Sequence, residues 1–141
     1  MTRSFPRAEL LQKAIDFHGH LGPYLVLGVL AGELALKKLK AKKYFGLTVK
    51  VWGATQKPKS CLIDGLQLST GATYGKGNIE KVEAKKIKIL IINKKTNHRL
   101  ELVLKKFLID QLDSLKEHKD SELFAKALFK TDLDSLFYSK F

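Results

Sequence analysis

The chain has 141 residues and a mass of 15.9 kDa, enough for one domain with a sizeable core. Hydrophobic residues make up 45% of it, which excludes a disordered chain, and the longest apolar run, 21–36, contains Glu33 and is too short to span a membrane. A single cysteine excludes an internal disulfide and a four-cysteine zinc module, and the absence of a signal-peptide pattern leads us to expect a cytoplasmic protein.

The net charge of +12 is concentrated in the middle of the chain. Residues 35–106 carry 18 Lys and Arg against four Asp and Glu. Such a stretch attracts a nucleic acid, an anionic cofactor or an acidic partner subunit. Arginine, which favours bidentate phosphate and base contacts, occurs only three times, so nucleic acid is not the expected partner. The plainer interpretation is a lysine-rich solvated surface.

Two helices are predicted in the first third of the chain. The first is expected over residues 4–17, and the second from residue 23 to about 43, with a buried apolar first half. Gly28 and Gly32, four positions apart on the second helix, favour the close approach of another backbone.

The rest of the chain reads as strands and further helices. Residues 47–52 alternate as a half-buried strand. Ser60 is the expected N-cap of a third helix, and Gly71 is expected at the position after its C-cap. An antiparallel meander is expected next, with strands at 79–84, 87–93 and 98–104. This order predicts an α+β fold, with amino-terminal helices packed on a mixed or largely antiparallel sheet. Residues 1–106 would form the core with the site, and 107–141 a helical extension packed on the core or on a dimer partner.

The stretch DFHGHLGPY, residues 16–24, carries two of the four histidines. In an unbroken helix His18 and His20 would point about 200° apart. They can therefore serve one site only where the helix is broken, and two glycines and a proline supply that break. The other histidines, His98 and His118, are expected at the surface.

Cys61 is the expected third member of this site. In the first turn of a helix, the helix dipole and free N–H groups favour a thiolate, which acts as nucleophile or metal ligand. Two imidazoles and a thiolate suit zinc or another transition metal with one position open, and Asp16 or Asp64 would orient a ligand. The plainer interpretations are an inert buried thiol and histidines that cap a helix end.

A glycine-rich loop follows the third helix. The glycine spacing of residues 71–77 does not fit a phosphate loop, but a general anion-binding loop remains open. A lysine between two glycines has little to pack against, which suggests a use outside the core. The residues predicted to contact an anionic ligand are Gln67, Thr70, Lys76 and Asn78.

Two stretches together resemble a known family. FHGHLGP, CLIDGLQ and the following TGATYGKGN resemble the formylmethanofuran dehydrogenase E-subunit family, whose members typically show F-H-G-H-x-C-P-G and then C-x-x-D-A-x-Q-x-x-T-G-C-T-x-G-K-G-N. The resemblance covers residues 8–110 and implies an α+β core, a homodimer and a metal site carried by His18, His20 and Cys61. Gly22 and Ala72 stand where the family often has cysteines.

The resemblance implies a metal-binding accessory or ligand-binding protein associated with a C1 or molybdopterin-dependent oxidoreductase as its partner. One alternative is an independent metal-dependent enzyme acting on an anionic small molecule, with Cys61, His20 and Asp64 as its catalytic residues. The other is a nucleic-acid-binding module that uses the basic middle of the chain. The sequence leaves open whether the protein is an enzyme.

Overall fold

The computed structural model describes residues 7–141, so the predicted start of the first helix at residue 4 lies outside the described residues. The elements are α1 (Arg7–His18), α2 (Pro23–Leu39), β1 (Leu47–Trp52), α3 (Cys61–Thr70), β2 (Ile79–Val82), β3 (Lys88–Asn93), β4 (Arg99–Leu104), α4 (Lys106–Asp113), α5 (His118–Phe129), a 3-10 turn η1 (Leu133–Ser135) and β5 (Phe137–Lys140). The predicted α+β class is confirmed. None of the described helices is long and apolar enough to cross a membrane.

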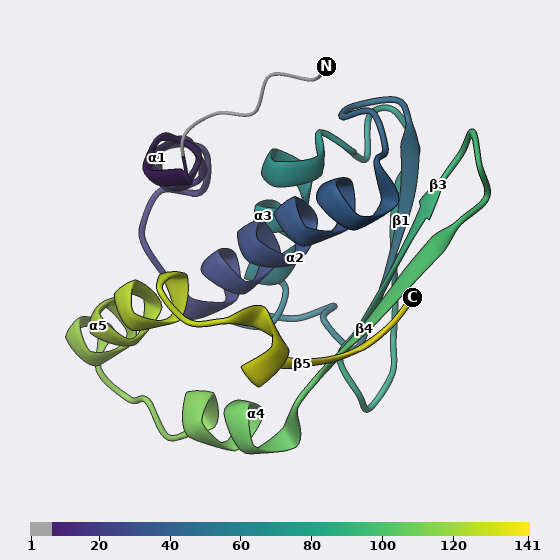
Figure 1. Ribbon diagram of the computed structural model, residues 1–141. Helices are drawn as coiled ribbons and strands as arrows, with labels where there is room; N and C mark the ends of the chain where they lie inside the picture. Colours follow the sequence, from purple (N-terminus) through teal and green to yellow (C-terminus); the bar gives the residue numbers. More distant parts are fainter. Residues whose placement is uncertain (1–6) are drawn as a thin grey trace.

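The helices lie on one side of a five-stranded sheet (Figure 1). The strand order is β2-β1-β3-β4-β5, with β1 and β2 parallel and all other neighbours antiparallel. Helix α2 packs against α3, α5 and the inner side of the sheet. The inward residues of the central strands, such as Val49, Ile89 and Leu102, are at most 2% exposed. The predicted period-two burial of β1 is therefore present.

The predicted three-strand meander is wrong for β2. This strand does not pair with β3, as a meander requires. It lies parallel beside β1, with Val49 paired to Ile79. The backbone N–H of Val49 donates to Asn78 O at the start of the pairing, and Gly53 N–H donates to Val82 O at its end. Short turns between neighbouring segments predict the meander. They carry no information on β1, which comes earlier in the chain and lies between β2 and β3 in the sheet.

The carboxyl-terminal segment is helical only in part. Helices α4 and α5 are present as predicted, but residues 137–140 form strand β5, which pairs with β4 at the edge of the sheet. Phe137 is 2% exposed and Tyr138 is 65% exposed, so these neighbouring residues face opposite sides of the sheet. Four residues are too short a window for this period to stand out in the sequence.

Helices α2 and α3 are in direct backbone contact. A Cβ added to Gly28 would lie 2.1 Å from Leu62 O, and one added to Gly65 would lie 2.2 Å from Leu25 O. One turn further along α2, a Cβ on Gly32 would meet the hydroxyl of Ser69. The close approach predicted from Gly28 and Gly32 is therefore present, and it fixes α3 against the amino-terminal helices.

Candidate functional site

The predicted helix break lies between the two histidines of the first motif. Helix α1 ends at His18, Gly19 adopts a φ of 106°, and α2 begins at Pro23. A positive φ of this size is accessible to glycine at little cost, which explains the residue at this turn. The break leaves His18 facing α3, where its Nδ1 lies 2.6 Å from Oδ2 of Asp64.

The contact with Asp64 fixes which nitrogen of the His18 ring donates. A carboxylate can only accept, so Nδ1 of His18 donates the hydrogen bond, and in the neutral ring Nε2 carries the lone pair. The His18 side chain is 11% exposed, and its buried Nε2 has no hydrogen-bond partner among the described residues. An unsatisfied buried polar atom is costly, and an imidazole backed by a carboxylate is the usual arrangement of a metal-binding histidine. His18 therefore fits the role of a metal ligand, with Asp64 orienting it.

A row of three imidazoles extends from this pair. The His20 ring lies 4.8 Å from that of His18 and 5.4 Å from that of His118, measured between centroids. Burial, followed by the charges of His18 and His118, lowers the pKa of His20, and Glu122 opposes the shift. His118 is exposed, as predicted, but its contact with His20 was missed, because nothing in the sequence indicates that the start of α5 meets the first motif.

A pocket of about 300 Å³ is lined by residues of α1, of α3 and of the connections that follow α2 and α3, and His18 and Asp64 are not part of its lining. Phe17 precedes His18 in the chain and Gln67 follows Asp64 by one helical turn, and both line the pocket. The lining also includes three lysines and a tyrosine: Lys13, Lys43, Lys76 and Tyr44. We call this cavity the lysine pocket.

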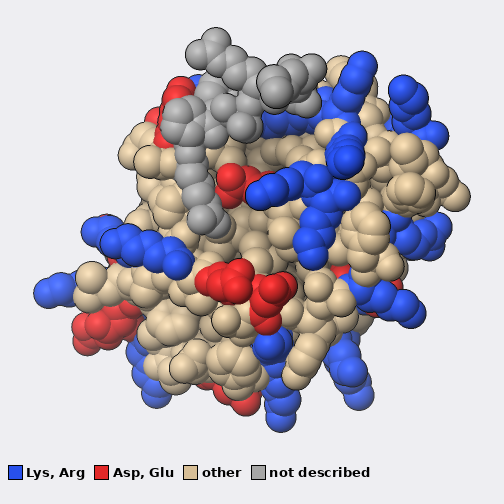
Figure 2. Space-filling model, in the orientation of Figure 1, with Lys and Arg blue, Asp and Glu red and all other residues tan. Residues whose placement is uncertain are grey.

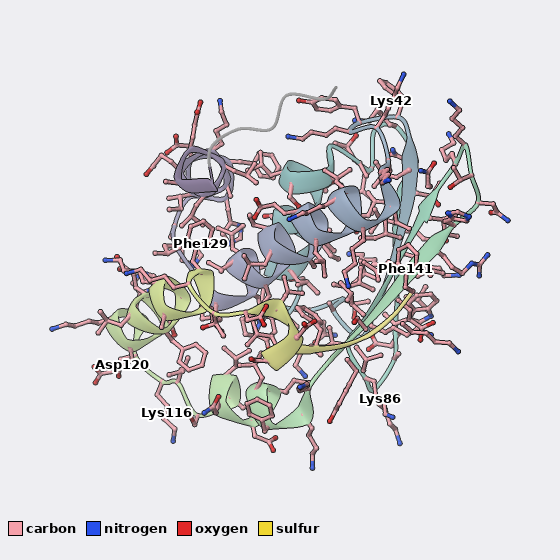
Figure 3. All side chains as sticks on the ribbon, viewed as in Figure 1. Lys42, Lys86, Lys116, Asp120, Phe129 and Phe141 are labelled. Carbon is pink, nitrogen blue, oxygen red and sulfur yellow. The ribbon has the colours of Figure 1, made fainter. Side chains whose placement is uncertain are left out.

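The lysine pocket lies at one end of the molecule. Lys42, which precedes two of its lining residues, is labelled in Figure 3 where α2 leads into β1, and Lys86 is at the opposite end of the sheet. Figure 2, in the same orientation, shows one group of Lys and Arg side chains toward the Lys42 end and others around the rest of the visible face.

Most of the chain matches one known family. Residues 17–135, which include both motifs and the His18–Asp64 pair, match the family described as "FmdE, Molybdenum formylmethanofuran dehydrogenase operon". The chain belongs to the FmdE family. The resemblance inferred from the two motifs is thereby confirmed.

Two relatives of this FmdE-family chain differ in how much of it they share. The crystal structure of a tungsten formylmethanofuran dehydrogenase E-subunit (FmdE)-like protein from Syntrophus aciditrophicus superposes with a TM-score of 0.67 at 21% identity, covering 99% of this chain and 76% of that one. It shares the fold. A probable S-adenosyl-L-methionine-binding protein from Archaeoglobus fulgidus is 32% identical over 88 residues, which are 62% of this chain. Those residues are 24% of that protein, so the match spans about a quarter of its length.

The ligand set that the FmdE resemblance implies is only partly assembled. Within residues 7–141, no three His, Cys, Asp or Glu side chains are arranged so that they could hold a metal ion. The set of His18, His20 and Cys61 therefore stays a prediction. Of the two aspartates expected to orient a ligand, Asp64 contacts His18, whereas Asp16 accepts a hydrogen bond from Gln12 on the surface.

The expected thiolate at Cys61 is not supported. Ser60 has helical dihedral angles and makes no capping hydrogen bond, and the N–H of Cys61 donates to Pro58 O. Burial, and then the charge of Asp64, raises the pKa of Cys61 above its usual value, with Lys57 and the backbone N–H of Cys61 opposing.

Cys61 in the metal-free protein should therefore react slowly with alkylating agents at neutral pH. We expect the reaction rate to rise with a midpoint above about pH 8.5, the ordinary cysteine value, because the thiol stays protonated until then. The rate of iodoacetamide alkylation against pH measures this midpoint. A denatured sample of the same chain is the control, and a native midpoint below that of the denatured chain would contradict the raised pKa.

The four predicted ligand contacts divide into two groups. Gln67 and Lys76 line the lysine pocket. Thr70 is 0% exposed and its hydroxyl donates to Leu66 O. Asn78 is 8% exposed, its amide nitrogen donates to Tyr44 O and Leu47 O, and its amide oxygen accepts from Thr73 N. The polar groups of Thr70 and Asn78 are thus engaged inside the protein, where they hold the loop that borders the pocket.

Proposed function

We propose that this FmdE-family protein is a cytoplasmic metal-binding accessory protein that binds an anionic small molecule and serves an oxidoreductase of C1 or molybdopterin-dependent metabolism. The observation that carries the proposal is the buried Nε2 of His18, which has no hydrogen-bond partner within residues 7–141, on a ring backed by Asp64 at 2.6 Å. Family membership supports the link to formylmethanofuran dehydrogenase, and the lysine pocket supports an anionic ligand. The Archaeoglobus relative, of which the shared region is 24%, is named as a binder of a small molecule, which agrees with this proposal.

The metal we propose is a divalent transition metal, with zinc as the first choice. When bound, such an ion supplies a Lewis acid and an open position for a ligand. His18 would hold it through Nε2, with Asp64 fixing the ring by the hydrogen bond to Nδ1. His20 and Cys61, which the family motif places with His18, are the further ligands in this proposal.

Metal binding by the tag-free protein tests this proposal. We expect elemental analysis to find about one transition-metal ion per chain, and calorimetry to show that His18→Gln abolishes zinc binding. Asp64→Asn should weaken zinc binding by about 10- to 100-fold, because it removes the carboxylate that orients the ligand ring. His98→Gln is the matched control, since His98 is exposed between β3 and β4.

Two outcomes would count against the proposal. Zinc binding that is equally strong in the native chain and in His18→Gln would place the ion elsewhere. Equal losses in His18→Gln and His98→Gln would indicate non-specific binding by surface histidines. Retained melting temperatures in both variants separate a lost ligand from a lost fold.

The proposal includes a homodimer and an oxidoreductase partner subunit. Large apolar residues on α4, α5, β5 and directly after β5 are more than half exposed: Phe107, Leu123, Tyr138 and Phe141. Such side chains are common at subunit interfaces. Sedimentation of the purified chain measures the homodimer, and co-purification from the native host measures the partner subunit.

An independent metal-dependent enzyme is a second candidate, favoured by one observation. The lysine pocket and the His18–Asp64 pair are built on the same two helices, with Phe17 and Gln67 lining the pocket from α1 and α3. In such an enzyme His20, whose pKa is lowered first by burial, would be available as a neutral base. Turnover by the zinc-loaded chain without a partner subunit would distinguish this candidate from the accessory role.

A further inference from the structure

Tyr44 has a backbone conformation that is unusual for an aromatic residue. Its φ is 77°, in the left-handed region that side chains with a Cβ disfavour. Three contacts hold it there. Its N–H donates to Thr70 O at 2.9 Å, its carbonyl accepts from Asn78 Nδ2 at 2.7 Å, and its ring lies against Gly71, where a Cβ would come within 2.4 Å of the ring.

This conformation does not serve the core, because the Tyr44 side chain is 50% exposed. It places the ring in the wall of the lysine pocket, which also contains the 57%-exposed Phe17. Strained residues persist where the surrounding structure holds them, and they cluster at binding sites. The protein therefore maintains an aromatic surface at this pocket at a cost in backbone strain.

The aromatic surface is flanked by positive charge. The ammonium groups of Lys43 and Lys76 lie 5.4 and 6.0 Å from the centroid of the Tyr44 ring. Lys13 lines the same pocket, and burial followed by the charge of Lys13 lowers the pKa of Lys43, with Glu33 opposing. Lys76 is also held by Thr73, whose hydroxyl lies 3.3 Å from its Nζ. An anion in the pocket would reduce the repulsion among these ammonium groups.

We propose that the lysine pocket binds a planar anion, with a flat ring stacked on Tyr44 and a phosphate or carboxylate held by Lys43 and Lys76. The volume of about 300 Å³ is at the lower limit of small-molecule sites, which favours a ligand the size of a mononucleotide over a large cofactor. This inference rests on the proposed anionic-ligand function and names the chemical class of that ligand. Stacking supplies the selectivity for the ring, and the lysines supply the attraction for the anion.

Four probes distinguish recognition of the planar ring from recognition of the anionic group. Adenosine 5′-monophosphate carries ring and phosphate, ribose 5-phosphate carries phosphate only, adenosine carries the ring only, and inorganic phosphate is the bare anion. In calorimetry at low salt, we expect the native chain to bind the monophosphate about tenfold more tightly than ribose 5-phosphate, and adenosine most weakly.

Two variants test which residues recognise the ring and which recognise the phosphate. Tyr44→Ala should remove the preference for the monophosphate while ribose 5-phosphate still binds. Lys76→Ala should weaken the binding of both adenosine 5′-monophosphate and ribose 5-phosphate. The matched controls are Tyr138→Ala and Lys140→Ala, which change exposed residues of β5 outside the pocket. Tyr44→Gly is a second test of the tyrosine. Because glycine tolerates the positive φ, this variant should melt at least as high as Tyr44→Ala and show the same loss of preference.

The outcomes distinguish this inference from the function on which it rests. If the native chain binds ribose 5-phosphate as tightly as the monophosphate, the planar-ring inference is wrong and the anionic ligand stands. If none of the three phosphates binds, both are wrong. Binding of adenosine as tight as that of the monophosphate would overturn the role of the lysines, and an unchanged preference in Tyr44→Gly would overturn the role of Tyr44.

Discussion

Replacing Gly28 with alanine is expected to lower the free energy of unfolding by about 3 kcal/mol, because the new methyl group would meet backbone atoms. The Cβ would lie 2.1 Å from Leu62 O and 2.9 Å from the Cα of Gly65, and neither atom can rotate away. The helices must separate, which opens the apolar layer between α2, α3 and the sheet. Chemical denaturation of the variant and the native chain measures the difference.

Gly75→Ala is the matched control for this substitution. A Cβ at Gly75 would have only the Thr73 hydroxyl near it, at 3.9 Å, so the change should stay within about 0.5 kcal/mol. The separation of α3 should also move Asp64 away from His18, so Gly28→Ala should weaken zinc binding beyond the control. Equal stability of the two variants would mean that α2 and α3 are not in backbone contact.

Local features of the fold were predictable because they depend on neighbouring residues. The break after His18 follows from the glycines and the proline beside it, and the close contact of α2 follows from Gly28 and Gly32. The burial of β1 follows from its alternation. The place of β2 beside β1 was not predictable, because it depends on Asn78 reaching a strand about thirty residues earlier in the chain.

The candidate site was predictable where the family motifs name its residues, and less so where distant elements complete it. His18 and Asp64 belong to the two motifs, and the structure joins them. His118 belongs to neither, and only the packing of α5 brings it to His20. The raised pKa of Cys61 depends first on burial, which comes from the packing of distant elements on the start of α3 and not from the first turn itself.

Replacing Asn78 with aspartate is expected to lower the free energy of unfolding by about 3 to 5 kcal/mol, because a buried carboxylate would replace an amide that donates two hydrogen bonds. The amide nitrogen lies 2.7 Å from Tyr44 O and 3.2 Å from Leu47 O, so the new oxygen would face two carbonyl oxygens. These bonds tie the pocket loop to the connection before β1. Their loss should therefore release Tyr44 as well as destabilise the fold.

The pH dependence of this loss identifies its cause. Burial beside two carbonyls would raise the pKa of the introduced carboxyl above its unfolded value of about 3.9, so the deficit relative to the native chain grows as pH rises through the folded pKa. Near pH 4 the protonated group can donate one bond again, and the deficit should be smaller than at about pH 8. Thermal melts of both chains across this range measure it.

Asn97→Asp is the control, because Asn97 is exposed in the turn between β3 and β4 and its φ of 63° suits aspartate as well. That variant should stay within about 0.5 kcal/mol of the native chain at every pH. If Asn78→Asp instead keeps the native melting temperature and loses affinity for adenosine 5′-monophosphate, Asn78 contacts the ligand, as the sequence alone suggested. The three hydrogen bonds of its side chain favour the structural role, since a group whose donors and acceptor are already engaged has little left to offer a ligand.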